Sequence, residues 1–147
     1  MFVKRMLLIA RDRLVTIRDD ALLIEAAALL RDLDCDLIVV CNSDELLAGV
    51  ITKADIVRQI SHCHGNGCMT AASSAMTSTV ILCRPGEPLP EVWSVMKERR
   101  LKSIPIVDQD VRPLGVLNAR DALEALLEEV EYEEILLREY VMCVGYR

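Results

Sequence analysis

The sequence predicts an α/β fold in which two copies of one small unit pair about a pseudo-two-fold axis. The first observation is a repeated motif: Gly49-Val-Ile-Thr-Lys-Ala-Asp55 returns 66 residues later as Gly115-Val-Leu-Asn-Ala-Arg-Asp121. The second is the apolar run Leu37–Val40 before the first motif, which is echoed by Ile104–Val107 before the second. The third is that both halves alternate short apolar runs with helical spacing. One such unit cannot cover its own apolar face, so we expect a single body made of two halves.

The apolar pattern of the first unit predicts each of its elements. Leu14–Ile17 is expected to be a short strand, and Ala21–Leu33 a helix because its apolar residues recur at helical spacing. Leu37–Cys41 is a continuous apolar run, which is typical of a strand buried on both faces. After a polar turn, Leu47–Ile51 is expected to be a strand and Thr52–Ile60 a helix. The unit therefore has the order β-α-β-β-α.

The second unit predicts the same order. Val80–Cys83 is expected to be a strand and Leu89–Arg100 a helix, followed by strands at Ile104–Val107 and Leu114–Leu117. The final helix is predicted to run from Ala119 to Tyr140, which makes it longer than its counterpart. We expect residues 1–61 to form the first repeat with an N-terminal extension, 62–79 a linker with a helical turn near residues 72–76, 80–128 the second repeat, and 129–147 a C-terminal helical extension.

Composition excludes several classes of function. The net charge of −6 comes from the last predicted helix, where Glu124–Tyr140 holds seven Glu and one Arg. The chain has no basic stripe and five aromatic residues, so no nucleic-acid partner is expected. Its apolar runs are far shorter than the roughly 20 residues that cross a membrane, and Met6–Ala10 is too short for a secretory signal. We therefore expect a cytoplasmic protein with no membrane partner.

The sequence contains none of the common catalytic motifs, and its two histidines both lie in the linker. No set of nucleophile, histidine and carboxylate spread over the fold can be proposed, so we do not expect an enzyme. Cys35, Cys41 and Cys83 lie in or beside apolar strands and are expected to act as small hydrophobic residues.

The repeated motif, Gly-h-h-(Thr/Asn)-x-x-Asp with h apolar, lies where a strand meets a helix. Thr52 and Asp55 resemble a capping box, and Asn118 and Asp121 can cap the second helix in the same way. The same geometry also suits a nucleotide, because a helix N-terminus offers N–H groups to a phosphate and a carboxylate can accept hydrogen bonds from ribose hydroxyls. The motif alone leaves both interpretations open.

Taken together, the motifs GVITKAD and GVLNARD, the strands LIVV and IPIVD, and the segment MTSTVILCRPGEPL resemble a known family. This family is the CBS-domain pair, or Bateman module, and the resemblance covers residues 14–128. It implies tandem CBS repeats with two clefts between the paired halves, which in many members bind adenine nucleotides or related adenosyl ligands. The resemblance thus implies AMP, ADP or ATP as a regulatory ligand and requires no cofactor.

The resemblance also implies roles for individual residues. Asp55 and Asp121 resemble the carboxylates that bind ribose. Thr52 resembles the hydroxyl beside the phosphate, and Asn118 stands in the corresponding place of the second unit, where the family usually has Thr or Ser.

The resemblance also implies that residues of two strands border the adenine base. These are Pro105 and Ile106 in the second unit and Ile38 and Val39 in the first, which lacks the proline. Three cations could contact a phosphate or could simply be solvated surface residues: Lys53, Lys102 and Arg120.

The linker adds a separate hypothesis. His62, Cys63, His64 and Cys68 place four soft ligands within seven residues, which could bind zinc, although the spacing is not that of a standard finger. A disulfide between Cys63 and Cys68 would be a redox switch, and a linker with free thiols is the third interpretation.

We therefore expect a stand-alone regulatory module that senses adenine nucleotides and signals to an unknown protein effector in trans. The resemblance also implies a homodimer formed through helix faces. The alternatives are a structural interaction module with empty clefts, or a metal or redox sensor centred on the linker.

Overall fold

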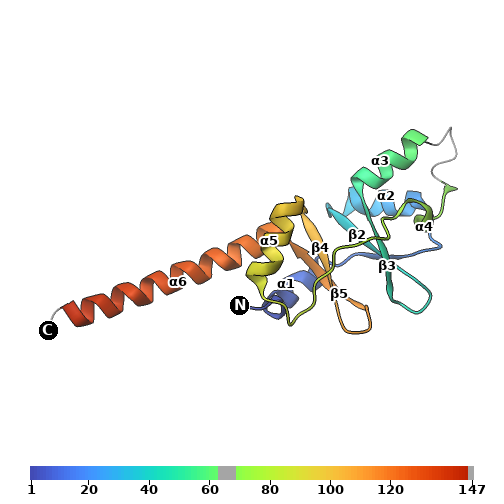
Figure 1. Cartoon of the computed structure of the whole chain (residues 1–147). Helices are drawn as coiled ribbons and strands as arrows, with labels where there is room; N and C mark the ends of the chain where they lie inside the picture. The colour runs from blue at the N-terminus through green and yellow to red at the C-terminus, as the bar shows by residue number, and fades with distance from the viewer. Residues whose placement is uncertain (63–68, 146–147) are drawn as a thin grey trace.

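The computed structural model describes residues 1–62 and 69–145 and confirms two α/β halves joined into one body. Figure 1 shows β2 and β3 with α2 and α3 in one half, and β4 and β5 with α5 in the other. The long α6 projects away from the second half. The pairing of two repeats thus buries the apolar face that one unit alone would leave exposed to solvent.

The first half is a three-stranded sheet in the order β1-β2-β3. β1 (Thr16–Arg18) runs parallel to β2 (Leu37–Cys41), which is antiparallel to β3 (Leu47–Thr52). All five residues of β2 are buried, as its continuous apolar run predicts. The two helices of this half are α2 (Leu23–Asp32) and α3 (Lys53–His62).

The second half repeats this plan. β4 (Ser103–Val107) pairs antiparallel with β5 (Pro113–Asn118), and α5 (Leu89–Arg99) packs against the start of α6 (Ala119–Gly145). Leu37 is paired with Thr52 in the first half and Ser103 with Asn118 in the second, so equivalent strand residues are 66 positions apart. The sequence comparison that set Leu37 against Ile104 is therefore one residue out of register.

The predicted strand Val80–Cys83 is wrong, because the structure has only a single parallel bridge between Cys83 and Ile106. The physical reason is Pro105. In the first half the N–H of Val39 donates to the carbonyl of Val15 at 2.9 Å, and Pro105 is the equivalent of Val39. Proline has no N–H, so it cannot continue the ladder toward Ile81.

The helix that precedes each unit packs on the other unit. A short 3₁₀ helix (Val3–Met6) and α1 (Leu7–Asp12) contribute Val3, Met6 and Ala10 to the core of the second half. In the same way α4 (Ala72–Ala75), which fits the predicted helical turn, packs into the core of the first half. The sequence analysis did not predict the N-terminal helices or this exchange.

The repeated glycines lie where these exchanged segments cross the sheet. A Cβ at Gly115 would be 2.7 Å from the carbonyl carbon of Ala10, and one at Gly49 would be 2.7 Å from the Thr77 carbonyl oxygen. Only glycine permits this close approach. A third apolar cluster, which includes Val39, Val50 and Val116, joins the two halves.

Candidate functional site

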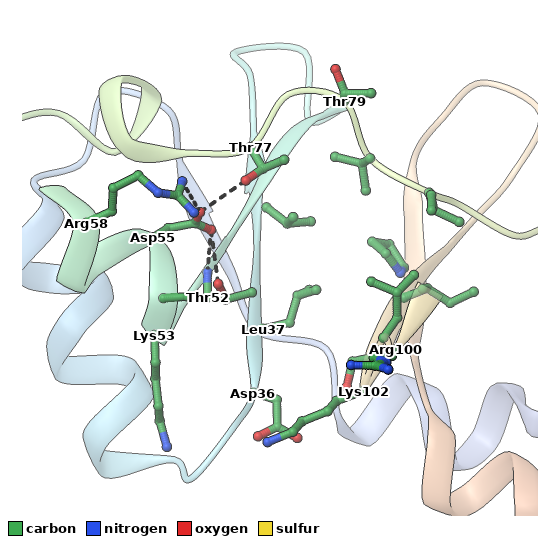
Figure 2. A pocket seen from close by; sticks show the side chains of 18 residues that line it. Asp36, Leu37, Thr52, Lys53, Asp55, Arg58, Thr77, Thr79, Arg100 and Lys102 are labelled. Carbon is green, nitrogen blue, oxygen red and sulfur yellow. Dashed lines mark hydrogen bonds and ion pairs between the residues drawn. The ribbon is translucent and has the colours of Figure 1, made fainter. Parts of the chain in front are cut away.

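A cleft of about 540 Å³ opens between the two halves. The first half lines it with the end of β3 and the start of α3, and the second half lines it with residues 100–105. Val80 and Ile81, from the segment that fails to form a strand, lie along its wall. Figure 2 shows Thr52, Asp55 and Arg58 on one side of this cleft and Arg100 and Lys102 on the other.

Asp55 is the one buried charged side chain among the described residues, with 4% of its surface exposed. Its Oδ2 accepts hydrogen bonds from the N–H of Thr52 at 2.9 Å and from Thr52 Oγ1 at 3.2 Å. Its Oδ1 accepts from Thr77 Oγ1 at 3.1 Å and from Arg58 Nη1 at 3.2 Å (Figure 2). The bond from the Thr52 N–H is one half of the predicted capping box, but the Thr52 hydroxyl donates to Asp55, whereas the prediction had it accept from a helix N–H. Thr77 and Arg58 extend the network beyond the cap.

The first cleft is rich in cations. Two carboxylates, Asp36 and Asp55, line it together with four basic side chains. The basic residues are Lys53, Arg58, Arg100 and Lys102. All four are exposed, so they remain hydrated and positively charged where a ligand would enter.

A second cleft of about 340 Å³ occupies the pseudo-symmetric position. Asn118 lines it and accepts a hydrogen bond from the N–H of Arg120 at 2.9 Å, which caps α6. Asp121 is instead held by Arg13, whose Nη2 donates to its Oδ1 at 2.9 Å and whose Nε donates to Oδ2. Arg13 thus covers the carboxylate that corresponds to Asp55.

The structure brings five of the predicted site residues to the first cleft and one to the second. Asn118 lines the second cleft. Those that line the first are Thr52, Lys53, Asp55, Lys102 and Pro105.

The other predicted residues line neither cleft. Ile38, Val39 and Ile106 are fully buried in the apolar cores, because their strands are covered on both faces. Asp121 lies against Arg13, and Arg120 is exposed on the first turn of α6. Their proposed roles in binding remain predictions.

Sequence reasoning missed several residues of these sites. Arg58 was detectable, because it lies one turn after Asp55 on the predicted helix and faces the same way. Thr77, Arg100 and Arg13 reach the clefts only through the pairing of the two halves. No local motif marks these three residues in the sequence.

The linker hypothesis falls mostly outside the described residues. His62 ends α3, and its ring contacts the carbonyl oxygen of Arg58 at 2.9 Å. Cys63, His64 and Cys68 lie outside the described residues, so the zinc and disulfide hypotheses stay predictions. Within residues 1–62 and 69–145 no group of three potential metal ligands comes together.

Three cysteines, Cys35, Cys41 and Cys83, are free thiols in apolar surroundings. Cys41 and Cys83 are buried, as expected, and Cys35 is half-buried. Burial raises the pKa of the Cys83 thiol to about 12, with a further contribution from the charge of Glu87. Burial likewise raises the pKa of Cys35 and Cys41, so none of the three is a reactive thiolate at neutral pH.

Across the described residues, no helix combines the length and apolar character needed to cross a bilayer.

The fold and the cleft define a class of protein: a tandem α/β module with a ligand-sized opening between its repeats. The CBS domain family matches residues 3–62 and 72–128. The chain therefore belongs to the CBS-domain family and contains two tandem repeats.

Curated relatives share the repeat region but are much longer. Residues of this chain match the homoserine O-acetyltransferase of Methanohalobium evestigatum with 27% identity over 116 residues, which is 79% of this chain and 22% of that protein. The corresponding enzyme of Methanosalsum zhilinae is 24% identical over 105 residues, 71% of this chain and 20% of that protein. The chain thus spans about a fifth of the length of these relatives.

Solved structures have the same fold. The CBS-domain containing protein ATU1752 from Agrobacterium tumefaciens superposes with a TM-score of 0.71 at 26% identity, covering 85% of this chain and 98% of that one. The CBS domain pair of MJ0100, in complex with 5′-methylthioadenosine and S-adenosyl-L-methionine, gives 0.71 at 22% identity, with coverage of 88% and 97%. CBSX2 in complex with AMP gives 0.70 at 21% identity, with coverage of 81% and 91%.

Proposed function

We propose that this chain is a regulatory module that senses an adenine nucleotide or related adenosyl ligand in the first cleft and performs no catalysis itself. The observation that carries the proposal is the buried carboxylate of Asp55, which lines a cleft whose opposite wall carries Arg100 and Lys102. Buried carboxylates are costly unless satisfied, and one that lines an open cleft is a candidate ligand contact.

Asp55 can bind the ribose only by releasing a present partner. A carboxylate has about four lone-pair sites, and Asp55 already accepts four hydrogen bonds. Arg58 is the partner that leaves most readily, because 65% of its side chain is exposed and its contact is 3.2 Å long. Binding of ribose hydroxyls would free the Arg58 guanidinium to face the ligand's phosphate.

The wall of the first cleft beside Pro105 is a suitable place for the adenine base. Val80 and Ile81 offer apolar surface there. Pro105 also provides no N–H to the carbonyl of Ile81, whereas the equivalent carbonyl of Val15 is bonded by Val39. The exocyclic amine of adenine is a suitable donor for that carbonyl.

The related structures support an adenosyl ligand. Their names record 5′-methylthioadenosine with S-adenosyl-L-methionine for MJ0100 and AMP for CBSX2. All three ligands share an adenine base on a ribose ring, and these are the parts that Asp55 and the wall beside Pro105 would contact.

Signalling would follow from linkage. A ligand held by both halves favours the arrangement in which they fit it, and the shift cannot exceed its differential affinity for the two arrangements. The proposal includes a cytoplasmic homodimer and a protein effector, for which α6 offers apolar side chains such as Leu127, Val130 and Leu137, all exposed in the single chain. Sedimentation of Leu137→Glu beside the native chain tests the dimer, and a native monomer would contradict it.

Calorimetric titration and thermal unfolding of the full chain with AMP, ADP and ATP test the ligand proposal. A ligand at about 100 times its dissociation constant should raise the free energy of unfolding by roughly 2.7 kcal/mol. Absence of both heat and a melting shift with every adenosyl compound would overturn the proposal.

A second candidate is a structural interaction module with empty clefts. The observation in its favour is that protein groups already donate four hydrogen bonds to Asp55, as many as its lone-pair sites can accept. In that case Asp55→Asn lowers the stability of the chain, and no adenosyl compound changes the melting temperature of the native protein.

A further inference from the structure

The two clefts have the same backbone and opposite charge. The 66-residue offset makes each residue of one cleft the counterpart of a residue in the other. Every basic side chain of the first cleft has a neutral or acidic counterpart. Lys53, Arg58, Arg100 and Lys102 correspond to Ala119, Glu124, Asp34 and Asp36 in that order.

The backbone confirms that these positions are equivalent. Arg100 has a φ of 56° at the end of α5, and Asp34, which follows α2, has a φ of 48°. Left-handed residues other than glycine are uncommon, so their recurrence at a 66-residue spacing marks the same turn in both halves. Arg100 lines the first cleft and Asp34 lines the second.

The second cleft has almost no positive charge to offer. Asp12, Asp34 and Asp36 line it, and among the residues that the structure describes Arg13 is its only basic lining residue. Arg13 is already bonded to Asp121 by two nitrogens. The hydrogen bonding to Asp121 is the main reason that the pKa of the Arg13 guanidinium is raised. The negative charges of Asp36 and Glu124 raise this pKa further.

We propose that the first cleft selects a phosphate-bearing adenosyl ligand over a cationic one, and that the second cleft rejects it, so that one nucleotide binds per chain. This inference rests on the proposed adenosyl function and specifies its ligand. A nucleotide phosphate is anionic, and a cleft lined by one sign of charge concentrates ligands of the opposite sign. S-adenosylmethionine carries a sulfonium cation, which the same residues repel.

The test is isothermal titration calorimetry of the full chain with ATP, AMP, adenosine and S-adenosylmethionine. We expect a stoichiometry of one, with affinity falling from ATP through AMP to adenosine and S-adenosylmethionine weakest. Rising salt should weaken ATP binding far more than adenosine binding, because screening acts on the phosphate contacts.

A charge exchange sharpens the test. Arg100→Asp with Lys102→Asp gives the first cleft the residues of the second at two of the four basic positions, and aspartate is already accepted in this turn at Asp34. We expect ATP affinity to fall at least about tenfold while adenosine affinity is unchanged. The matched control, Lys97→Asp with Arg99→Asp, changes the net charge equally on α5, outside both clefts, and should retain more of the ATP affinity.

The outcomes separate this inference from the proposed function. Tighter binding of S-adenosylmethionine than of ATP, two ATP per chain, or unchanged ATP affinity in the charge-exchange variant would each overturn the inference while the adenosyl function stands. If no adenosine compound binds at all, the proposed function fails, and the inference fails with it.

Discussion

Asp55 and Asp121 hold the same place in the two halves but have different neighbours. The carboxylate of Asp55 is bonded by Thr52, Thr77 and Arg58 and faces a cleft with cations across it. The carboxylate of Asp121 is bonded by Arg13 beside a cleft with three other aspartates. The repeated backbone therefore does not impose a repeated chemistry.

The difference arises where the two halves meet. Apolar strand positions and the glycines under the exchanged helices keep their type in both repeats, because packing depends on them. Apart from Asp55, the charged residues that line the clefts are exposed, so they can change sign at little cost to the fold. Duplication gives two clefts, and surface charge makes them unlike.

The largest expected difference between the halves is in thiol reactivity. Cys83 is buried with a pKa of about 12, so at pH 8.5 we expect its alkylation to be about a thousandfold slower than in the unfolded chain. Cys35, half-buried in the first half, should react faster. Brief iodoacetamide treatment followed by mass spectrometry of each peptide, with and without urea, measures both.

The sign of this shift also predicts a pH effect. The folded pKa of Cys83 lies above the ordinary thiol value of 9.0, so its contribution to stability is lost as the pH rises from 9 toward 12. Equal labelling of Cys83 and Cys35 in the native protein would show that the core of the second half opens readily.

The next largest effect is expected from removing one charge from each repeat. Asp55→Asn should lower the free energy of unfolding by about 2–3 kcal/mol, because the buried carboxylate is the charged acceptor of four hydrogen bonds, and should abolish the melting shift produced by ATP. Asp121→Asn is the matched control. It should cost less than about 1 kcal/mol and leave the ATP shift intact, because Arg13 is 44% exposed. Urea unfolding with and without ATP measures both, and equal effects would refute the asymmetry.

A smaller effect should come from the repeated glycines. A methyl group at Gly115 meets the backbone of Ala10, so Gly115→Ala should cost about 1–3 kcal/mol by forcing α1 off the sheet. At Gly49 part of the clash is with the flexible Met76 side chain, so Gly49→Ala should cost less. Thermal unfolding of the two variants measures which loses more stability. A greater loss for Gly49→Ala would contradict the prediction that the backbone contact at Gly115 is the tighter one.

Much of the fold could be predicted because apolar periodicity reports burial directly. The run Leu37–Cys41 and the motif before Asp55 each gave the correct element within a residue or two. Val80–Cys83 failed because the strand depends on a partner: a proline in β4 removes the donor it needs. The N-terminal helices were missed because their apolar face, with Val3 and Met6, is short and packs on distant residues.

The sequence predicted those residues of the candidate site that lie close together in the chain. Thr52 and Asp55 belong to one motif, and the structure places both in the first cleft. Arg100 and Arg13 could not be placed from the sequence, because each reaches its cleft from the other half. Pro105 was noticed as a border of the base, but its effect on the ladder needed the register of β4.

The exchange of α1 and α4 has a consequence for folding during synthesis. Ala10 leaves the ribosome about a hundred residues before Gly115, the position it must cover, so the opening helices wait through most of synthesis without their final contacts. α4, by contrast, emerges just after the sheet that receives it. During synthesis the first half should therefore fold early. The second half should complete its core only when the N-terminal helices pack onto it.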